Sequence, residues 1–528
     1  MGMANLEYSI LAFAFKTLSS YSRLLEFGEA LKNIKYDVIG LAEIRRLGNS
    51  IEEYEDFILY YIGQTPGLYG VGFLVHKRHK ANIIYFKGIS ERVALLQINV
   101  DNTVISIIQC YAPTESAKEK EVELFYKNVN KALKTSGKHL IVMGDFNAKI
   151  GQPKQAENLI TKSYGYGHRN RRGEKLIQFA CENKLAILNT FFKKKNNRRW
   201  TWRSPNGKVK NEIDYILTNL EKYAQDIQVI NIKYPSDHRL VRATFTLQSK
   251  RKNRKSYGGN VKNTLKNEQQ VQSYKDSLYD NLAELANKQH SYTVQELYSK
   301  IAAAINISLK TAQEVSKHKD TDSIISARTR LLMLRRQYLQ NTKPKTRTMK
   351  NELKALYKLI SKYIRNDYDT HRKKTIEKHI IQYGSLKRAN KELRSHKTWI
   401  EGLKASNKTT YERKEILKVA TNFYRELYDY ENEEPPSIST IISEIQSNIQ
   451  DVDETEVMNG IASLKLDKSP GPDKITNEAL KLGSPYLKTP LTQLFNMVLK
   501  TANKKELKVQ LKNINQWNRQ ALEEVSLL

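Results

Sequence analysis

Short apolar runs alternate with amphipathic stretches over the first 248 residues. The apolar runs have the length of buried strands and include YDVIGLAEI, VALLQINV, VISIIQCYAP and HLIVMGDFNAKI. Between them, residues 20–34, 118–134 and 173–183 space their apolar side chains three and four positions apart, which is typical of helices. Many strands with a few intervening helices favour an α/β sandwich over a simple alternating Rossmann-type fold.

The pattern changes after residue 248. Long stretches such as 294–309, 324–339 and 350–380 have helical periodicity and contain few Gly or Pro residues. Further along, amphipathic helical spacing surrounds the sequence LKLDKSPGPDKITNEALK. The chain is therefore predicted to have three parts, namely an α/β domain (1–248), a basic, mainly helical linker (249–435) and a mainly helical C-terminal piece (436–528).

The distribution of charge supports this division and indicates a partner. The chain carries a formal net charge of +32, of which residues 249–430 contribute +22 and residues 1–248 contribute +13. The run KRKNRK at 250–255 and the break ENEEPP at 431–436 mark the two boundaries. Such a cationic excess predicts contact with nucleic acid, either double-stranded DNA or, through the linker, RNA. The alternative for the linker is that its charges only form a solvated helix face.

The cysteine content and the lengths of the apolar runs exclude several classes of protein. No apolar run approaches the roughly 18 to 20 residues that a membrane-spanning helix needs, and the first ten residues lack a signal-peptide pattern. Cys110 and Cys181 form no CxxC pair, so a disulfide framework and a cysteine zinc site are excluded as organising principles. We expect an intracellular, nuclear protein with both thiols in its core.

Polar side chains of the types needed for phosphodiester hydrolysis stand where the predicted strands of the first part end. This reaction needs a divalent cation held by carboxylates, an activated water and a group that stabilises the developing charge. A single strand-end acid is more often an ordinary cap than a ligand, but the ordered set makes coincidence improbable. The set consists, in chain order, of Glu43, Tyr111, Asp145, Asn147, Asp214, Asp237 and His238.

The motifs around these residues read Tyr-Ala-Pro, Gly-Asp-Phe-Asn, Ile-Asp-Tyr and Ser-Asp-His. With them, residues 8–247 resemble the apurinic/apyrimidinic-like endonucleases of RTE-type non-LTR retrotransposons, including sequences labelled craniofacial development protein 2-like. These proteins belong to the exonuclease-endonuclease-phosphatase superfamily. The resemblance implies a four-layer α/β sandwich, with two packed β-sheets flanked by helices, that nicks double-stranded DNA with Mg²⁺ or Mn²⁺.

The resemblance also implies roles for the residues at the metal and the attacking water. Glu43 would hold the metal, and Asp237 would contribute a second ligand to it. Asp145 would orient the attacking water. Asn147 would help to position the water or the phosphate.

A second group of implied roles concerns the phosphate itself. Tyr111 would contact the scissile phosphate, and His238 would stabilise charge on it. Asp214 would fix the tautomer and orientation of His238. These roles are expectations carried over from the family motifs, position by position.

One position departs from the family pattern. Relatives usually carry an Asn in a first strand that reads roughly Asn-Val-Arg-Thr-Leu, whereas AFAFKTL places Ala14 there. A methyl group cannot bind a metal-bound water, and the loss of such a contact costs about 10-fold to 100-fold in metal affinity or activity. Three functions therefore stay open: a DNA-nicking enzyme, a catalytically impaired nucleic-acid-binding protein, and another phosphoesterase of the same superfamily.

Two cationic stretches are candidates for contact with DNA. Arginine grips phosphate, and tryptophan stacks on bases or wedges between them. Alternatively, the tryptophans pack a hairpin, because alternate side chains of a strand face inward. The candidates are Arg169, Asn170, Arg171 and Arg172 in GYGHRNRRGEKL, and Trp200, Trp202 and Arg203 in KKKNNRRWTWRSPNG.

The C-terminal piece carries a different resemblance. The sequence KSPGPDKITNEALK at 468–481 is similar to the opening of a non-LTR reverse transcriptase. Two-metal polymerisation requires clustered aspartates, and no Tyr/Phe-Ala-Asp-Asp sequence occurs in the chain. We therefore expect a truncated reverse-transcriptase start without polymerase activity.

Overall fold

The computed structural model describes residues 4–249, 265–286, 292–314, 324–428 and 451–501, apart from a few single or paired positions inside these ranges. The two predicted boundary sequences, KRKNRK and ENEEPP, lie outside the described residues. Two compact units are present, one formed by residues 1–253 and 323–416, the other by 254–322 and 417–528. Each unit is described by itself.

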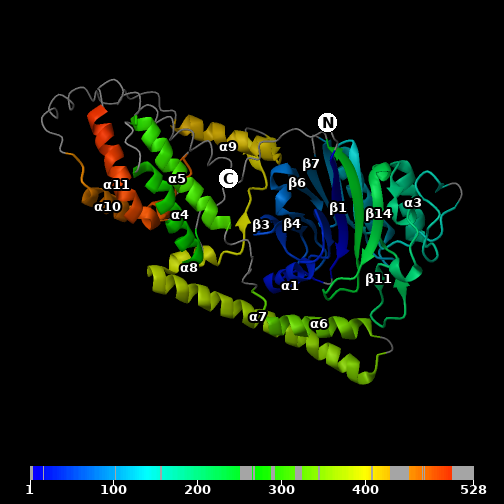
Figure 1. Cartoon of the computed structure of the whole chain (residues 1–528). Coiled ribbons are helices and arrows are strands. Elements are labelled where there is room, and N and C mark those ends of the chain that lie inside the picture. The colour runs from blue at the N-terminus through cyan, green and yellow to red at the C-terminus, as the bar shows by residue number, and fades with distance from the viewer. Residues whose placement is uncertain are drawn as a thin grey trace. The chain divides into compact units, whose positions relative to one another are not determined.

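Two β-sheets form the centre of the first unit (Figure 1). The larger sheet has the order β14 (Ala224–Ile230), β15 (Leu240–Ser249), β1 (Ala4–Ala14), β2 (Val38–Ala42), β5 (Val71–His76), β4 (Phe57–Gly63), β3 (Gly48–Glu53) and β16 (Lys397–Thr398). The smaller sheet has the order β10 (Ala186–Ile187), β13 (Asp214–Thr218), β9 (His139–Asp145), β8 (Thr103–Tyr111), β7 (Val93–Val100) and β6 (Ile83–Ser90). Both sheets mix parallel and antiparallel neighbours, as the β1–β2 and β8–β9 pairs are parallel.

The apolar runs found in the sequence fill the space between the sheets. One buried cluster joins Phe73 and Val38 of the larger sheet to Leu96, Ile107 and Met143 of the smaller one. Every residue of β2 is buried, as expected for a strand covered on both faces. The core of the unit therefore lies between two sheets packed face to face.

Helices cover the outer faces of both sheets. Helix α1 (Tyr21–Leu31) packs Phe27 and Leu24 into a cluster on the larger sheet. Helices α2 (Glu119–Lys134) and α3 (Arg171–Glu182) pack their apolar sides, including Phe125 and Leu176, on the smaller sheet. This order of layers confirms the predicted four-layer α/β sandwich.

The two cysteines differ in exposure. Cys110 is buried as predicted, but Cys181 is exposed, so the prediction that both thiols lie in the core was wrong for Cys181, which lies in the amphipathic helix α3.

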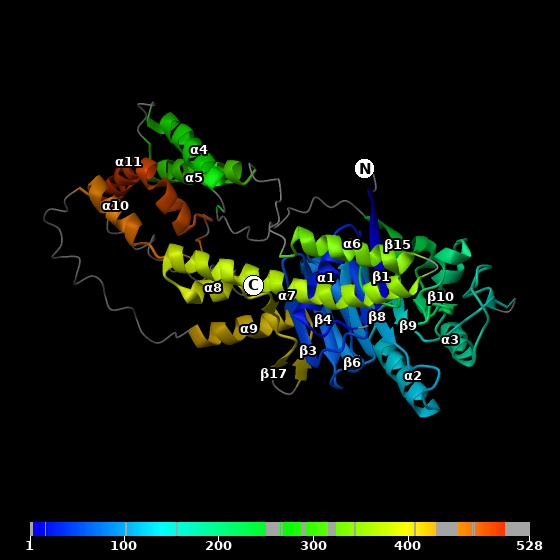
Figure 2. The same cartoon turned by 90° about the horizontal axis from the view of Figure 1, so that it is seen from below.

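Part of the predicted linker packs onto this sandwich. Helices α6 (Ala327–Asn341) and α7 (Arg347–Tyr383) form a hairpin across α1, as Figure 2 shows. The Arg336 guanidinium donates to the Glu26 carboxylate at 2.6 Å, and both side chains are 1% exposed. After α8 (Leu386–Glu392), strand β16 extends the larger sheet, and the amide of Trp399 donates to Ile51 at 2.8 Å. The independent folding of residues 1–248 stays a prediction, while the contacts group residues 323–416 with the sandwich.

The second unit is helical, as predicted for this part of the chain. Helices α4 (Glu268–Ala286), α5 (Val294–Glu314), α10 (Glu454–Ser463) and α11 (Asn477–Thr501) belong to it, and α4, α5 and α11 share one apolar cluster around Tyr274 and Leu487. The Tyr274 hydroxyl donates to the carbonyl of Ala479 at 3.0 Å. In the part of the chain that is described, no helix combines the length and apolar character needed to cross a membrane. Helix α9 (Arg413–Tyr428) and the short hairpin β17 (Leu403–Ala405) and β18 (Lys408–Thr410) complete the described elements beyond residue 400.

Candidate catalytic site

The register of the strands gathers the predicted catalytic residues at one edge of the two sheets. In the smaller sheet Asp145 is the partner of Tyr111 on β8 and of Asp214 on β13. In the larger sheet β2 ends at Ala42, directly before Glu43. The parallel strands β8 and β9 thus present their carboxyl ends where the antiparallel β13 begins, which brings side chains distant in sequence together.

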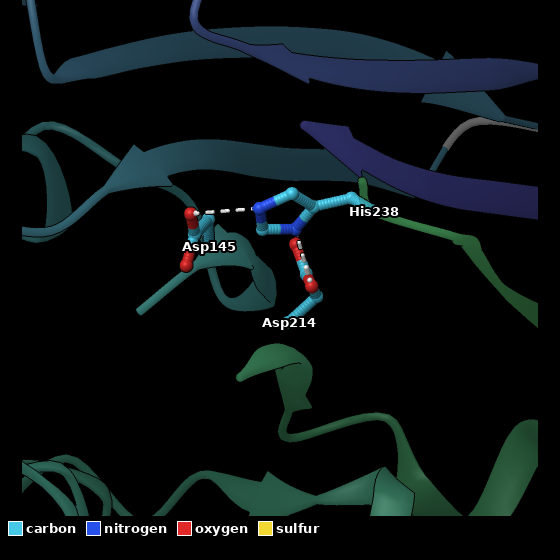
Figure 3. Close-up of side chains that lie close together, drawn as sticks. All are labelled: Asp145, Asp214 and His238. Atoms are coloured by element: carbon cyan, nitrogen blue, oxygen red, sulfur yellow. Dashed lines mark hydrogen bonds and ion pairs between the residues drawn. The ribbon is translucent and has the colours of Figure 1, made fainter. Parts of the chain in front are cut away.

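His238 lies between two buried carboxylates (Figure 3). Its Nδ1 atom is 2.9 Å from Oδ2 of Asp214, and its Nε2 atom is 3.8 Å from Oδ2 of Asp145. The three residues are 8%, 0% and 2% exposed, in the same order. The first contact is a hydrogen bond that fixes the ring, whereas the second is longer than a hydrogen bond and leaves His238 Nε2 directed at Asp145.

Burial and mutual repulsion set the protonation of this cluster. Burial alone disfavours a charged imidazole, but the carboxylates of Asp214 and Asp145 outweigh it and raise the pKa of His238. Burial also raises the pKa of Asp145, and the nearby Asp214 and Glu43 carboxylates raise it further, against the opposing effect of His238. The His238 imidazole and the Asp145 carboxylate thus both bind protons more readily than usual.

Glu43 and Tyr111 form the other side of the site. The Tyr111 hydroxyl donates to Oε1 of Glu43 at 3.1 Å, and the Arg45 guanidinium donates to Oε2 at 2.7 Å. Burial, together with Glu43 and Asp145, raises the pKa of Tyr111, so this residue keeps its proton and acts as a donor. The electrostatic effect of both acids on Tyr111 places Glu43 and Asp145 at the same site.

Two predicted site residues have strained backbones. Glu43 has a φ of 55° and Asn147 a φ of 48°, a left-handed conformation that is uncommon for residues with a side chain. Asn147 stabilises its own turn, because its amide donates to Oδ1 of Asp145 and its Nδ2 donates to the carbonyl of Ala112, both at 2.9 Å. Strain of this kind concentrates at functional sites, where the surrounding structure compensates for its cost.

Asp237 is held beside the cluster by a tryptophan. Its Oδ2 accepts a hydrogen bond from Trp202 Nε1 at 3.1 Å, and Trp202 also forms a β-bridge with His238. The negative charge of Asp237 contributes to the raised pKa of His238. Among the described residues, the group close enough to share one metal ion consists of Asp145, Asp214 and His238 and does not include Asp237.

The donor set fits a hard divalent cation. Carboxylate oxygens are the preferred ligands of Mg²⁺ and Mn²⁺, and ligand atoms of Asp145, Asp214 and His238 lie within 4.8 Å of one another. Oδ1 of Asp214 is buried, and none of the described residues forms a hydrogen bond with it. Glu43 adds a further carboxylate to this site, where its Oε1 atom accepts a hydrogen bond from the Tyr111 hydroxyl at 3.1 Å.

Ala14 lies where the family Asn is expected. It ends β1, pairs with Ala42 on β2 next to Glu43, and is completely buried. Its carbonyl accepts a hydrogen bond from the Ser236 hydroxyl at 2.9 Å, which ties β1 to the segment that carries His238. The side chain itself offers the site only a methyl group.

The first group of predicted DNA contacts has mostly internal partners. Arg169 is 9% exposed and forms an ion pair with Glu157, and Asn170 caps α3 by accepting from the amide of Gly173 at 2.9 Å. The Arg172 side chain is 8% exposed and donates to the carbonyl of Ala117 at 2.8 Å. The Arg171 side chain is 75% exposed and is therefore the most accessible of the four. DNA contact by this group stays a prediction.

The second group lies beside the catalytic edge. Trp200 is 8% exposed, with the Arg239 guanidinium 3.3 Å and the Lys210 ammonium 5.2 Å from the centre of its ring. Trp202 and Arg203 form β11 (Trp202–Arg203), which pairs with β12 (Lys210–Asn211), and both side chains are half-buried. For Trp200 the position matches the alternative in which the side chain packs a hairpin. DNA contact by Trp202 and Arg203 stays a prediction.

A buried network behind Asp214 was not predicted. The Asn189 side-chain amide donates to the Asp214 carbonyl at 3.1 Å and to Glu212 at 3.2 Å, while Arg199 donates to the Asn189 carbonyl at 3.1 Å. Burial raises the pKa of Glu212 to about 7, although Arg199 opposes this. Glu212 lies two residues before Asp214 in NEIDY. This spacing is the sequence signal that could have indicated a second buried acid next to Asp214.

A family comparison agrees with this geometry. Residues 105–242 match the family model described as Endonuclease-reverse transcriptase, a range that includes Tyr111, Asp145, Asp214 and His238. Craniofacial development protein 2 of Bos taurus is 32% identical over 229 residues, which cover 42% of this chain and 38% of that protein. The same protein of Tragulus javanicus is also 32% identical, over 42% of this chain and 39% of its own length.

Solved structures provide a further comparison. The endonuclease domain of TRAS1, a telomere-specific non-LTR retrotransposon, is 16% identical, with a TM-score of 0.35, over 46% of this chain and all of that one. The match falls on less than half of this chain. The curated relatives extend well beyond the aligned region, which spans less than two fifths of their length.

Proposed function

We propose that the first unit is a Mg²⁺- or Mn²⁺-dependent endonuclease that nicks double-stranded DNA. The observation that supports this most directly is the Asp214–His238–Asp145 arrangement opposite Glu43 and Tyr111, on a sandwich of the phosphoesterase superfamily. Phosphodiester cleavage needs a proton acceptor for water and donors for the phosphate. The site holds both within one buried edge.

In the proposed reaction the oxygen of the attacking water bonds to the scissile phosphorus while Asp145 accepts a proton from that water. The P–O bond to the leaving deoxyribose oxygen breaks, and this oxygen takes up a proton from solvent. The raised pKa of Asp145 makes it a better proton acceptor than an exposed carboxylate. His238, oriented through Nδ1 by Asp214, donates from Nε2 to a phosphate oxygen, and the Tyr111 hydroxyl donates to a second one. A divalent cation held by Glu43 and Asp145 would supply Lewis-acid stabilisation of the phosphate.

The charge of the chain favours nucleic acid as the substrate. A net charge of +32 concentrates a polyanion at the protein surface, and the matched family model names an endonuclease coupled to a reverse transcriptase. We therefore extend the proposal to a non-LTR retrotransposon open reading frame, in which residues 436–528 are the start of a reverse transcriptase. A DNA substrate implies a nuclear location, and the basic helices would offer RNA a second binding surface.

A catalytically impaired nucleic-acid-binding protein is the second candidate. Ala14 favours it, because the methyl group sits beside Glu43 where relatives have an amide. The test is nicking of supercoiled plasmid by the full chain with Mg²⁺, Mn²⁺ or EDTA, with Asp145→Asn as the matched control. Metal-dependent nicking that Asp145→Asn lacks supports the enzyme, and binding without nicking supports the second candidate. Preferential cleavage of inositol phosphates or RNA would instead indicate another phosphoesterase.

A further inference from the structure

A cationic pocket lies next to the catalytic edge. It has a volume of about 510 Å³, and its lining includes Lys194, Arg198, Gln228, Asn231 and Arg239. Residues 228–230 at the carboxyl end of β14 and Arg239, directly before β15, are among its lining residues, and Ile230 pairs with Leu240. Among the described residues that line it, none is acidic.

The pocket is joined directly to the catalytic residues. Arg239 follows His238 in the chain, so their Cα atoms are about 3.8 Å apart. The amide of Arg239 donates to the carbonyl of Thr201 at 2.7 Å, and the amides of Ile213 and Asp214 donate to the Thr201 hydroxyl at 3.0 and 3.1 Å. The same backbone therefore positions Asp214, His238 and one wall of the pocket.

Arg239 is preorganised, and no carboxylate of the described residues pairs with it. Its guanidinium lies on the Trp200 ring and donates from NH1 to the carbonyl of Asn197 at 3.0 Å, while its Nε is buried without a hydrogen-bond partner. Burial and the nearby Arg203 lower the pKa of Arg239 to about 10, so the group stays charged at neutral pH. In the described part of the chain, the structure shows no ion pair for Arg198 or Arg239, while Lys194 is paired with Asp226 at 2.6 Å.

We propose that this pocket, with Arg198 and Arg239 as its principal cations, binds a non-scissile phosphate of the DNA strand that is cut at His238. This inference rests on the proposed function and adds a substrate-positioning subsite to it. Phosphates of one strand rise about 3.4 Å per nucleotide along the helix axis, so the phosphate lies within a few nucleotides of the scissile one. A planar guanidinium with free donors suits a phosphodiester better than a point charge does.

Arg198→Gln tests the subsite, because Arg198 is exposed and its replacement leaves the packing of Trp200 intact. The matched control is Lys131→Gln, which removes the same charge from an exposed position in the last turn of α2. That turn precedes β9, whose far end carries Asp145, so the control lies at the opposite edge of the sheet. Both variants of the full chain are compared with the parent in plasmid nicking and in binding of a 20-base-pair duplex across a salt series with EDTA.

We expect Arg198→Gln to raise KM and the Kd of the duplex by about 3- to 10-fold, with kcat unchanged, and to lower the salt slope of binding by about 0.9, the value for one lost phosphate contact. Arg239→Lys keeps the charge but loses the planar fork, and it should weaken binding less. Equal behaviour of Arg198→Gln and Lys131→Gln would overturn the subsite even if the parent nicks DNA. If the parent binds the duplex without nicking DNA, the proposed enzymatic function is wrong, and the comparison of binding still tests the subsite. If the parent neither binds nor nicks DNA, both proposals are wrong.

Discussion

Strand β2 has an acidic residue next to each of its ends, and the two ends are opposite in character. Asp37, directly before the strand, is 1% exposed and accepts hydrogen bonds from the amide of Ser9 at 2.7 Å, from Arg78 and from His79. Burial opposes its charge, but these donors outweigh it and lower the pKa of Asp37. This carboxylate is fully satisfied by the protein.

At the other end, Glu43 faces a cluster in which acids repel one another. Asp145 there has its pKa raised by burial and by the carboxylates of Asp214 and Glu43. Both ends contain a buried Asp paired with a His, so residue types alone do not separate them. The balance of donors and charges separates them. The donors around Asp37 neutralise its charge, whereas the acids around Glu43 still need a cation to balance theirs.

The same substitution at the two ends should have opposite effects, and the largest is expected at Asp145. Asp145→Asn removes the proposed proton acceptor and should lower the nicking rate by about 10³-fold. Because the pKa of Asp145 is raised in the folded protein, its ionised form lowers the stability of the fold at any pH above the ordinary pKa of Asp. The melting temperature of the variant at pH 7 should therefore be no lower than that of the parent. Plasmid nicking and thermal melting check this, and parent-like nicking would refute the proposed role.

Asp37→Asn should act on stability instead. Removing one partner of a buried ion pair costs about 3 to 5 kcal/mol, and the folded fraction should nick DNA as the parent does. Because the folded-state pKa of Asp37 is lowered, its contribution is present above the unfolded value of 3.8 and disappears as the pH falls below it. Urea unfolding of parent and variant at pH 7 and pH 3 measures this, and an equal difference at both values would contradict it.

Glu43→Gln should change the metal requirement rather than the fold. The variant keeps a hydrogen-bond acceptor for Tyr111 but loses a charged ligand, so half-maximal nicking should need on the order of 10- to 100-fold more Mg²⁺. The Mg²⁺ dependence of the initial rate measures this shift. Identical curves for parent and variant would exclude Glu43 as a ligand.

Ala14→Asn should have the smallest effect. Ala14 pairs with Ala42, directly before Glu43, so an amide at this position should raise nicking at limiting Mg²⁺ by about 10-fold. If the parent and Asp145→Asn are both inert while Ala14→Asn is active, the natural chain is a disabled enzyme. No gain in rate or metal affinity would show that the Asn of relatives has no counterpart here.

The sandwich and its catalytic edge could be predicted because both follow from local pattern and known motifs. Glu43 directly follows the buried strand β2, Asp145 ends β9, and the strand register pairs Asp145 with Asp214. The internal role of Arg169 could not be predicted, because its partner Glu157 is selected by loop geometry rather than by periodicity. The packing of residues 323–416 was also missed, since no local pattern links Arg336 to Glu26.

That ion pair has a consequence for how the protein is made. Glu26 and Arg336 are 310 residues apart, so translation at about 5 to 20 residues per second separates their appearance by about 15 to 60 seconds. During this interval Arg23, which lies 2.8 Å from Glu26 in the folded protein, is available to pair with Glu26. Leu25 is not yet covered by the hairpin of α6 and α7. The outer layer of the first unit closes only after about two thirds of the chain has left the ribosome.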